Sequence, residues 1–490
     1  MLTWDIETEI LFVTLKRRQK ARLGLTSLQS INPATGETLR SFEPHSGSQI
    51  EEALDHSSTA FVEWRRAGFE GRGRLMRKAA GILREGKNRL GRIITSEMGK
   101  PIAEAEAEVE KCAWNCDHYA ENAERILRDE ARESNASESY VQYTPLGVVL
   151  AIMPWNFPFW QVFRFAVPAL MAGNTAILKH ASNVPQCALA IEEIFASAGF
   201  PAGVFRALLI PGGAVRVLIE DPRIAAVTLT GSEIAGSETA ALSGRMLKKT
   251  VLELGGSDPF IVLADADLDA AVKTGVRARY QNTGQSCIAA KRFIVAAAVY
   301  GRFCERFVEV VRSLKVGDPM DRTCEIGPLA RPDLLDALEL QVRASVSAGA
   351  RLVLGGSRRA GRGCFFDPTV LAEVRPDMPA GREEVFGPVA ALMKAADESE
   401  ALKIANDSPY GLGASLWTRN LDLARRMARE IEAGQVFVNG MVISDPRLPF
   451  GGVKRSGYGR ELSDFGIREF VNIQTVWIGP AGSAQARPVR

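Results

Sequence analysis

The stretch GVVLAIMPWNFPFWQVFRFAVPALMAGNTAILKH, residues 147–180, contains two short apolar runs separated by a segment with helical spacing. The runs at 147–153 and 175–180 are typical of buried strands, and the segment between them ends at Gly173. Three more apolar runs follow, with a helical segment in each gap, at 204–210, 224–230 and 250–254. Strands that alternate with helices predict an α/β fold, in which helices cover both faces of a parallel sheet.

Composition excludes several classes of protein. A chain of 490 residues corresponds to about three domain-sized units, and its net charge of +2 gives no nucleic-acid footprint. Seven cysteines without dense spacing and four scattered histidines predict neither a disulfide framework nor a metal site. No apolar window is long enough to cross a membrane. We therefore expect a cytoplasmic protein that has a loose N-terminal extension over residues 1–27.

Chemically useful residues follow four of the predicted strands at the point where each strand ends: Trp155 and Asn156, Lys179, Gly231 with Ser232, and Glu253. Ligands of open parallel sheets bind at the carboxyl ends of strands, so these residues are expected to share one crevice. Asn156 lies between Pro154 and Pro158, which hold it rigidly as a hydrogen-bond donor. Backbone N–H groups at Gly231 and Gly236 can face a phosphate at a helix start.

Each of these residues also has a structural alternative. Asn156 can serve as the N-cap of the helix that follows it, and Lys179 can be a solvated strand end. Gly231 and Gly236 can serve packing alone, because they do not form the Gly-x-Gly-x-x-Gly fingerprint. Glu253 is harder to explain structurally, because a carboxylate at the end of an apolar strand is costly unless it is paired or functional.

The segment QNTGQSC, residues 281–287, delivers Cys287 on a turn of small residues after a predicted helix. A nucleophilic thiol needs access, a base, and donors for the negative charge that its attack creates. Gly284 gives access, and Glu253 can be the base. The Asn156 amide and the backbone N–H of Cys287 can be the donors. This constellation predicts acyl-transfer chemistry through Cys287.

Six ordered motifs carry a family resemblance: PWNFP, LTGS, LELGG, GQSC, EEVFGPV and PFGGVKRSGYGREL. Together they resemble the NAD(P)-dependent aldehyde dehydrogenase superfamily over about residues 28–480. Within it, KHASNVPQCA, WQVFRFA and GIREFVNIQTVW look most like the short bacterial succinate-semialdehyde dehydrogenases. The resemblance implies a Rossmann-type parallel-sheet cofactor domain, an α/β catalytic domain and a β arm for oligomerisation, hence a homodimer or homotetramer.

The implied domains divide the chain as follows: a cofactor domain at 28–130 and 148–253, a catalytic domain at 254–445, the arm at 131–147 and 470–480, and a segment returning to the cofactor domain at 446–469. The arm segments at 137–147 and 470–478 alternate like strands.

The resemblance also implies a role for each motif residue. Cys287 would attack the aldehyde carbon, Asn156 and the Cys287 N–H would hold the oxyanion, and Glu253 would activate the water that hydrolyses the thioester. The presence of Glu253 disfavours a CoA-acylating enzyme. The implied cofactor residues are Lys179 at the adenosine ribose, Trp155 and Ser232 at the pyrophosphate, and Glu384 and Phe386 at the nicotinamide ribose and ring.

The substrate prediction depends on a spacing of four residues. Asn156, Trp160 and Arg164 would lie on one helix face, which places Arg164 along the tunnel to the nucleophile. In the resembling enzymes an arginine here and a serine that matches Ser444 hold a substrate carboxylate. A guanidinium suits this task, because it binds a carboxylate through two parallel hydrogen bonds. Succinate semialdehyde is therefore the expected substrate.

Three alternatives remain open at this point. Arg164 can instead form an internal salt bridge, with Asp445 as one possible partner. The enzyme can be a broader aldehyde dehydrogenase that acts on glutarate semialdehyde or neutral aldehydes. The chain can also be a catalytically silent homologue, although Cys287, Glu253 and Asn156 are all present and argue against this.

Cofactor choice is predicted from Ser182, three residues after Lys179. Many NAD-preferring relatives carry a glutamate there, which accepts hydrogen bonds from the adenosine ribose and repels a 2′-phosphate. Ser182 lacks that repulsion, Lys179 adds a positive charge, and His180 is expected to add a partial one. NADP is therefore the expected preferred cofactor, with NAD also accepted. Alternatively, Ser182 merely caps the next helix.

Overall fold

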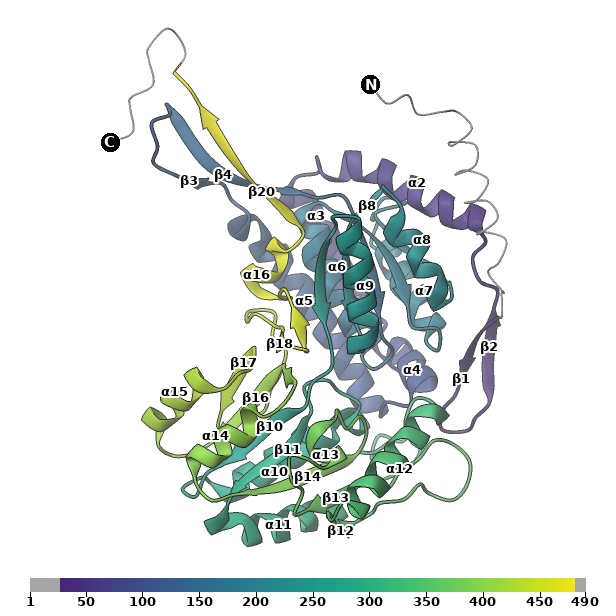
Figure 1. The fold of residues 1–490 in the computed structure, drawn as a ribbon. Coiled ribbons are helices and arrows are strands. Elements are labelled where there is room, and N and C mark those ends of the chain that lie inside the picture. The colour runs from purple at the N-terminus through teal and green to yellow at the C-terminus, as the bar shows by residue number, and fades with distance from the viewer. Residues whose placement is uncertain (1–26, 481–490) are drawn as a thin grey trace, which may run out of the picture.

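The computed structural model describes residues 27–480, so the expected N-terminal extension lies outside the described residues, apart from Ser27. Two sheet-based units lie one above the other, and a narrow β arm projects from the upper unit (Figure 1). No helix within residues 27–480 is long and apolar enough to cross a membrane.

The first sheet contains the five strands predicted from the apolar runs. Its order is β19-β9-β8-β5-β6-β7, and all pairs except β19 with β9 are parallel. The strands are β5 (Val148–Met153), β6 (Thr175–His180), β7 (Phe205–Ala207), β8 (Ile224–Thr230), β9 (Lys249–Glu253) and β19 (Gly457–Tyr458). The α/β prediction is confirmed.

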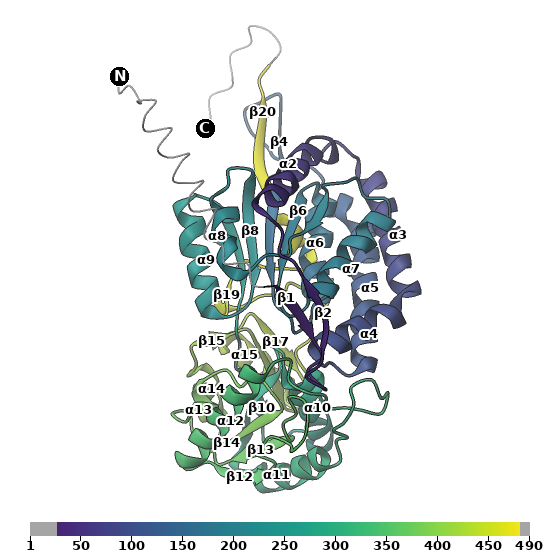
Figure 2. The same ribbon diagram turned by 90° about the vertical axis from the view of Figure 1, so that its right-hand side faces the viewer.

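Helices cover both faces of this sheet (Figure 2). On one face lie α3 (Phe69–Glu85), α4 (Lys87–Met98), α5 (Ile102–Ile126), α6 (Trp160–Ala172) and α7 (Pro185–Ser197). On the other face lie α2 (Gly47–Trp64), α8 (Val215–Glu220) and α9 (Glu233–Arg245). Alternate residues of β5 join different cores: Val149 and Ala151 pack with the first group, while Val148 and Leu150 pack with the second. This explains why a strand buried on both sides reads as one continuous apolar run.

The second sheet has the order β12-β13-β14-β11-β10-β16-β17 and is parallel except at β12. Its strands are β10 (Asp258–Val262), β11 (Ala290–Ala296), β12 (Arg351–Leu354), β13 (Thr369–Ala372), β14 (Val389–Ala395), β16 (Gly413–Trp417) and β17 (Gln435–Val438). Its helices are α10 (Leu268–Tyr280), α11 (Ala297–Arg312), α12 (Pro332–Ser347), α13 (Pro379–Arg382), α14 (Glu398–Asn406) and α15 (Leu421–Glu430). Separate apolar clusters fill its two faces.

The arm is an antiparallel sheet of three strands, β3 (Glu130–Ala131), β4 (Glu138–Pro145) and β20 (Val471–Ile478). β20 pairs with β4 along its whole length, from Val471 opposite Pro145 to Ile478 opposite Glu138. The two segments predicted to alternate as strands are therefore paired. Smaller elements complete the described chain: β1 (Leu28–Ile31), β2 (Thr38–Phe42), β15 (Tyr410–Gly411), β18 (Val453–Lys454) and α16 (Ser463–Arg468).

Candidate active site

The predicted strand ends meet at one edge of the first sheet. Strands β9, β8, β5 and β6 are adjacent and parallel, so their carboxyl ends lie side by side. Glu253 ends β9, and its carbonyl oxygen accepts a hydrogen bond from the N–H of Gly231 at 3.0 Å. Asn156 and Lys179 come from the ends of β5 and β6. The strand ends that the sequence was expected to bring together therefore meet in the fold.

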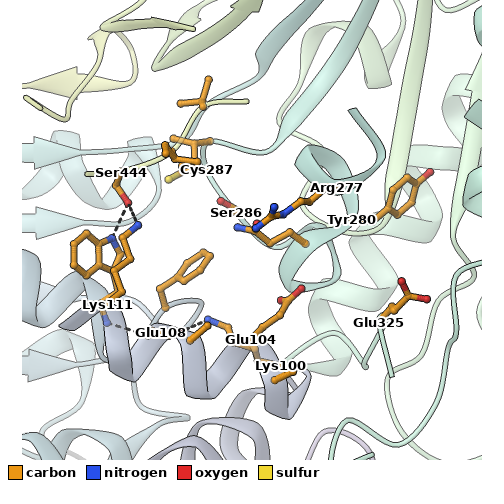
Figure 3. A pocket seen from close by; sticks show the side chains of 18 of the residues that line it. Lys100, Glu104, Glu108, Lys111, Arg277, Tyr280, Ser286, Cys287, Glu325 and Ser444 are labelled. Atoms are coloured by element: carbon orange, nitrogen blue, oxygen red, sulfur yellow. Dashed lines mark hydrogen bonds and ion pairs between the residues drawn. The ribbon is translucent and has the colours of Figure 1, made fainter. Parts of the chain in front are cut away.

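Cys287 follows a loop with unusual backbone geometry. Asn282, Thr283 and Gly284 have φ values of 56°, 55° and 72°, in the left-handed region that non-glycine residues rarely adopt. Glu104 on α5 accepts a hydrogen bond from the N–H of Asn282 at 2.7 Å, and Arg279 donates to the carbonyl of Gly284 at 2.7 Å. Strain of about 1–3 kcal/mol per residue persists only where surrounding contacts fix the conformation. This loop delivers Cys287 to a cavity of about 820 Å³ (Figure 3).

The amide of Asn156 reaches across to the cysteine loop. Its Nδ2 donates to the carbonyl oxygen of Gln285 at 3.0 Å, and its Oδ1 accepts from Gln161 at 3.0 Å, which fixes the orientation of the amide. An amide nitrogen carries two hydrogens, so one remains for an oxyanion. Helix α6 begins at Trp160 without a side-chain cap, so the alternative that Asn156 is its N-cap is wrong.

Glu253 is buried, and among residues 27–480 neither of its carboxyl oxygens has a hydrogen-bond partner. Burial raises its pKa well above the ordinary value, and the nearby carboxyl of Glu461 raises it further. A carboxyl in this setting holds its proton more tightly than one in water, and it can act as a base only in its ionised form.

Burial also raises the pKa of the Cys287 thiol, to about 12, while the positive charge of Lys291 opposes the shift. Lys291 is fully buried in β11, and its Nζ donates to the carbonyls of Ser286 and Cys287 at 2.7 Å each. The same ammonium lies 3.4 Å from the carboxylate of Glu384. Sequence reasoning missed Lys291, although a lysine inside the apolar run AAKRFIV was a signal.

The predicted cofactor residues Lys179 and Ser182 flank the end of β6. Lys179 is buried, forms no ion pair within the described part of the chain, and has a pKa lowered by burial. Ser182 is exposed in the turn before α7. The first amides of α7, at Gln186 and Cys187, donate to Glu97 at 3.0 and 2.9 Å. The alternative that Ser182 caps this helix is therefore wrong.

The expectation that His180 carries a partial positive charge is also wrong. Its ring nitrogens lie 3.2 Å from the carbonyl oxygen of Met153 and 2.9 Å from that of Pro158. Burial lowers its pKa to about 4. The imidazole is therefore neutral near pH 7, and its contacts join the ends of β5 and β6 instead of facing a phosphate.

The remaining cofactor candidates occupy the same region. The rings of Trp155 and Phe386 meet edge to face, with centroids 5.8 Å apart, and Glu384 accepts from the N–H of Gly256 at 3.0 Å. Ser232 caps α9 by accepting from Ala235 at 3.3 Å. Gly236 serves packing, because a Cβ there would collide with Leu254.

The three predicted substrate residues all line the cavity. Trp160 donates its indole N–H to Ser444 Oγ at 3.0 Å. Arg164 forms a buried ion pair with Glu461 and donates to Thr230 Oγ1 at 3.5 Å. An internal salt bridge of Arg164 therefore exists.

The partner suggested for that salt bridge was wrong, because Asp445 pairs with Arg447 at 2.6 Å. Sequence reasoning also missed Lys111 on α5, which lines the cavity and donates to Ser444 Oγ at 2.7 Å. The helical spacing of Glu104, Glu108 and Lys111 was the available signal, since it puts all three on one face of α5.

Comparison with known proteins agrees with this geometry. Residues 21–476 match the aldehyde dehydrogenase family. The chain belongs to this family. The chain is therefore an aldehyde dehydrogenase, and the fold and family predicted from the sequence are confirmed.

Several aldehyde dehydrogenases are closely similar to this one. A protein of Synechocystis named as a probable NADP(+) succinate-semialdehyde dehydrogenase is 54% identical over 92% of this chain and 100% of its own length. A succinate-semialdehyde dehydrogenase [NADP(+)] of Mycobacterium avium is 51% identical over 94% of this chain and 98% of its own. The crystal structure of succinic semialdehyde dehydrogenase from Streptococcus pyogenes with NADP+ superposes with a TM-score of 0.90, at 39% identity, over 92% of this chain and 100% of the other.

Proposed function

We propose that this aldehyde dehydrogenase oxidises succinate semialdehyde to succinate with NADP+, and that it also accepts NAD+. The observation that carries the proposal is the cavity itself. It joins the Cys287 thiol to Ser444 and Arg164, polar groups set among the aromatic side chains of Phe157, Trp160 and Phe450. A short aldehyde with a distal carboxylate fits such an arrangement. The names of the relatives from Synechocystis and Mycobacterium support it.

The residues have separate tasks in this reaction. Cys287 Sγ loses its proton to solvent and bonds to the aldehyde carbon, and the C=O π bond opens to an oxyanion. The free N–H of Asn156 and the backbone N–H of Cys287 stabilise this oxyanion. A bound NADP+ would supply the hydride acceptor for this carbon, and the product of that oxidation is a thioester on Cys287. Glu253 in its ionised form takes a proton from water, whose oxygen attacks the thioester. Cleavage of the C–S bond releases the acid, and the departing thiolate takes the proton back from Glu253 to regenerate the thiol.

The residues present fit a phosphorylated dinucleotide. Lys179 is a buried cation without a carboxylate partner in the described part of the chain. A phosphate or ribose oxygen of the cofactor would be that partner. Ser182 places a hydroxyl on the same edge, where a carboxylate would repel a 2′-phosphate. We assign Trp155 and Ser232 to the pyrophosphate, and Glu384 and Phe386 to the nicotinamide ribose and ring. The N–H of Gly231 donates to the carbonyl of Glu253 and that of Gly236 to the carbonyl of Ser232, so the expectation that these two groups face a phosphate is wrong.

A panel of aldehydes assayed with wild type and two variants tests the function and the catalytic roles together. Succinate semialdehyde should give the highest kcat/KM, ahead of glutarate semialdehyde and butanal. Cys287→Ala should abolish oxidation and leave cofactor binding intact. Glu253→Gln should release one equivalent of reduced cofactor in a burst and then turn over very slowly, because the thioester persists. Wild-type cycling by Glu253→Gln would exclude it as the deacylating base, and a preference for butanal would exclude the substrate.

Cofactor choice is tested by Ser182→Glu. A carboxylate in this turn should lower kcat/KM for NADP+ by at least about tenfold, equivalent to about 1.4 kcal/mol, and spare NAD+. Ser182→Ala is the matched control, because it removes the hydroxyl without adding charge. A wild type that strongly prefers NAD+, or a Ser182→Glu variant unchanged with NADP+, would contradict the assignment.

We also propose that the arm joins copies of this chain into a dimer or tetramer. Ile473 on β20 is 64% exposed, and Trp477 and Ile478 are exposed beside it, which leaves apolar side chains on a strand that projects from the molecule (Figure 1). Sedimentation equilibrium of the purified protein should therefore show a homo-oligomer at micromolar concentration. A monomer under these conditions would refute the proposal.

A further inference from the structure

The wall of the cavity formed by α5 carries charged residues that the reaction above does not use. Glu104, Glu108 and Lys111 follow one another at helical spacing along this wall, and Lys100 lies just before the helix (Figure 3). At the end nearest Ser444, Lys111 Nζ donates to Ser444 Oγ at 2.7 Å, and the ammonium lies 4.3 Å from the centre of the Trp160 ring. Lys111 thus borders the same cavity as Cys287.

Most charged side chains around this part of the cavity already form an ion pair with another side chain. Arg164 is paired with Glu461, and Lys100 with Glu108. Glu108 also accepts hydrogen bonds from the N–H groups of Phe159 and Trp160, both at 2.9 Å, so it is fully engaged at the start of α6.

Lys111 differs from these residues. It forms no ion pair within residues 27–480, and Asp445, the acid beside Ser444, is held by Arg447. Two more residues that line the cavity, Lys273 and Arg277, also form no ion pair in the described part of the chain. Both are exposed on α10. Lys111 is therefore the partly buried cation in the cavity whose charge still lacks a counterion.

The hydrogen bonds around Ser444 determine what its hydroxyl can do. Ser444 Oγ accepts from Lys111 and from the indole N–H of Trp160, at 2.7 and 3.0 Å. A hydroxyl oxygen has two lone pairs, and both are then occupied, so its own hydrogen is left to donate. The ammonium also keeps two of its three hydrogens. Together the two groups present several donors and one unmatched positive charge, which is what a carboxylate requires.

We propose that Lys111 binds the distal carboxylate of the substrate and sets the preference for ω-carboxy aldehydes, with Ser444 as the second donor. This inference rests on the proposed function. Arg164 is then not the main ligand of the carboxylate, because its guanidinium forms an ion pair with Glu461 and its Nη2 donates to Thr230. In the absence of a carboxylate, burial and the charge of Arg164 lower the pKa of Lys111 to about 8.

The test compares succinate semialdehyde with butanal, which has the same chain length and no charge. Lys111→Met keeps the bulk and removes the ammonium. It should lower kcat/KM for succinate semialdehyde by at least about 30-fold, mainly through KM, and change butanal oxidation by less than about twofold. Lys111→Arg should restore most of the loss. Lys78→Met removes an equal charge from the exposed surface of α3, away from the cavity, and should change the ratio of the two substrates by less than about twofold.

A pH series supplies a readout that a purely structural role would not change. The charged and titratable groups facing Lys111 are Glu108 and Cys112 on its own helix, Arg164 on α6, and Asp445 beside Ser444. In the wild type, the ratio of kcat/KM for succinate semialdehyde over butanal should fall as pH rises above about 8, where Lys111 loses its proton. The pH dependence of steps that both substrates share cancels in this ratio. The fall should disappear in Lys111→Met and in Lys111→Arg.

The outcomes are distinguishable. A wild type that does not oxidise succinate semialdehyde refutes the proposed function, and this inference with it. If the wild type is active, equal losses on both substrates in Lys111→Met mean that the lysine is structural, and unchanged activity on both means that another group holds the carboxylate. Either result overturns the role of Lys111 and leaves the proposed function standing.

Discussion

Asn156 and the cysteine loop come from different parts of the chain, and amide hydrogen bonds in both directions hold them together. Asn156 donates to the carbonyl of Gln285 at 3.0 Å, and Asn282 donates back to the carbonyl of Asn156 at 2.9 Å. These bonds join the end of β5, in the first sheet, to the loop that leads into β11, in the second. The proposed oxyanion donors and the proposed nucleophile keep their mutual geometry only while this contact persists. The left-handed conformation of Asn282 and Thr283 is tolerated for the same reason.

Burial then decides the charge states in the site. The thiol of Cys287 and the carboxyl of Glu253 both have raised pKa values, so burial favours the neutral form of each group. Two of the buried cations have carbonyl or carboxylate partners close by: Lys291 has the carbonyl of Cys287, and Arg164 has the carboxylate of Glu461. A cavity that keeps its nucleophile and base uncharged until substrate arrives avoids the cost of burying two unpaired anions.

Local pattern predicted the first sheet well, because strands buried on both faces and their helices are encoded in consecutive residues. The strand-end residues were predicted for the same reason, since parallel strands bring their carboxyl ends together. Partners distant in sequence were not predictable. Lys111 and Ser444 lie 333 positions apart, and Glu461 meets Arg164 only after the chain returns from the second sheet. The neutral state of His180 depends on its burial, which only the folded chain defines, while the carbonyls of Met153 and Pro158 oppose the lowering of its pKa.

The central claim is that Cys287 is an accessible nucleophile kept protonated by burial. It is tested most directly by the rate at which iodoacetamide alkylates Cys287 without cofactor, followed by mass spectrometry of its peptide between pH 6 and pH 9. The thiolate is the reactive form, so the rate should rise about tenfold per pH unit without a plateau. The buried Cys112, Cys116 and Cys187 should remain unmodified. A rate for Cys287 that is independent of pH above pH 7 would show a resting thiolate and contradict this account.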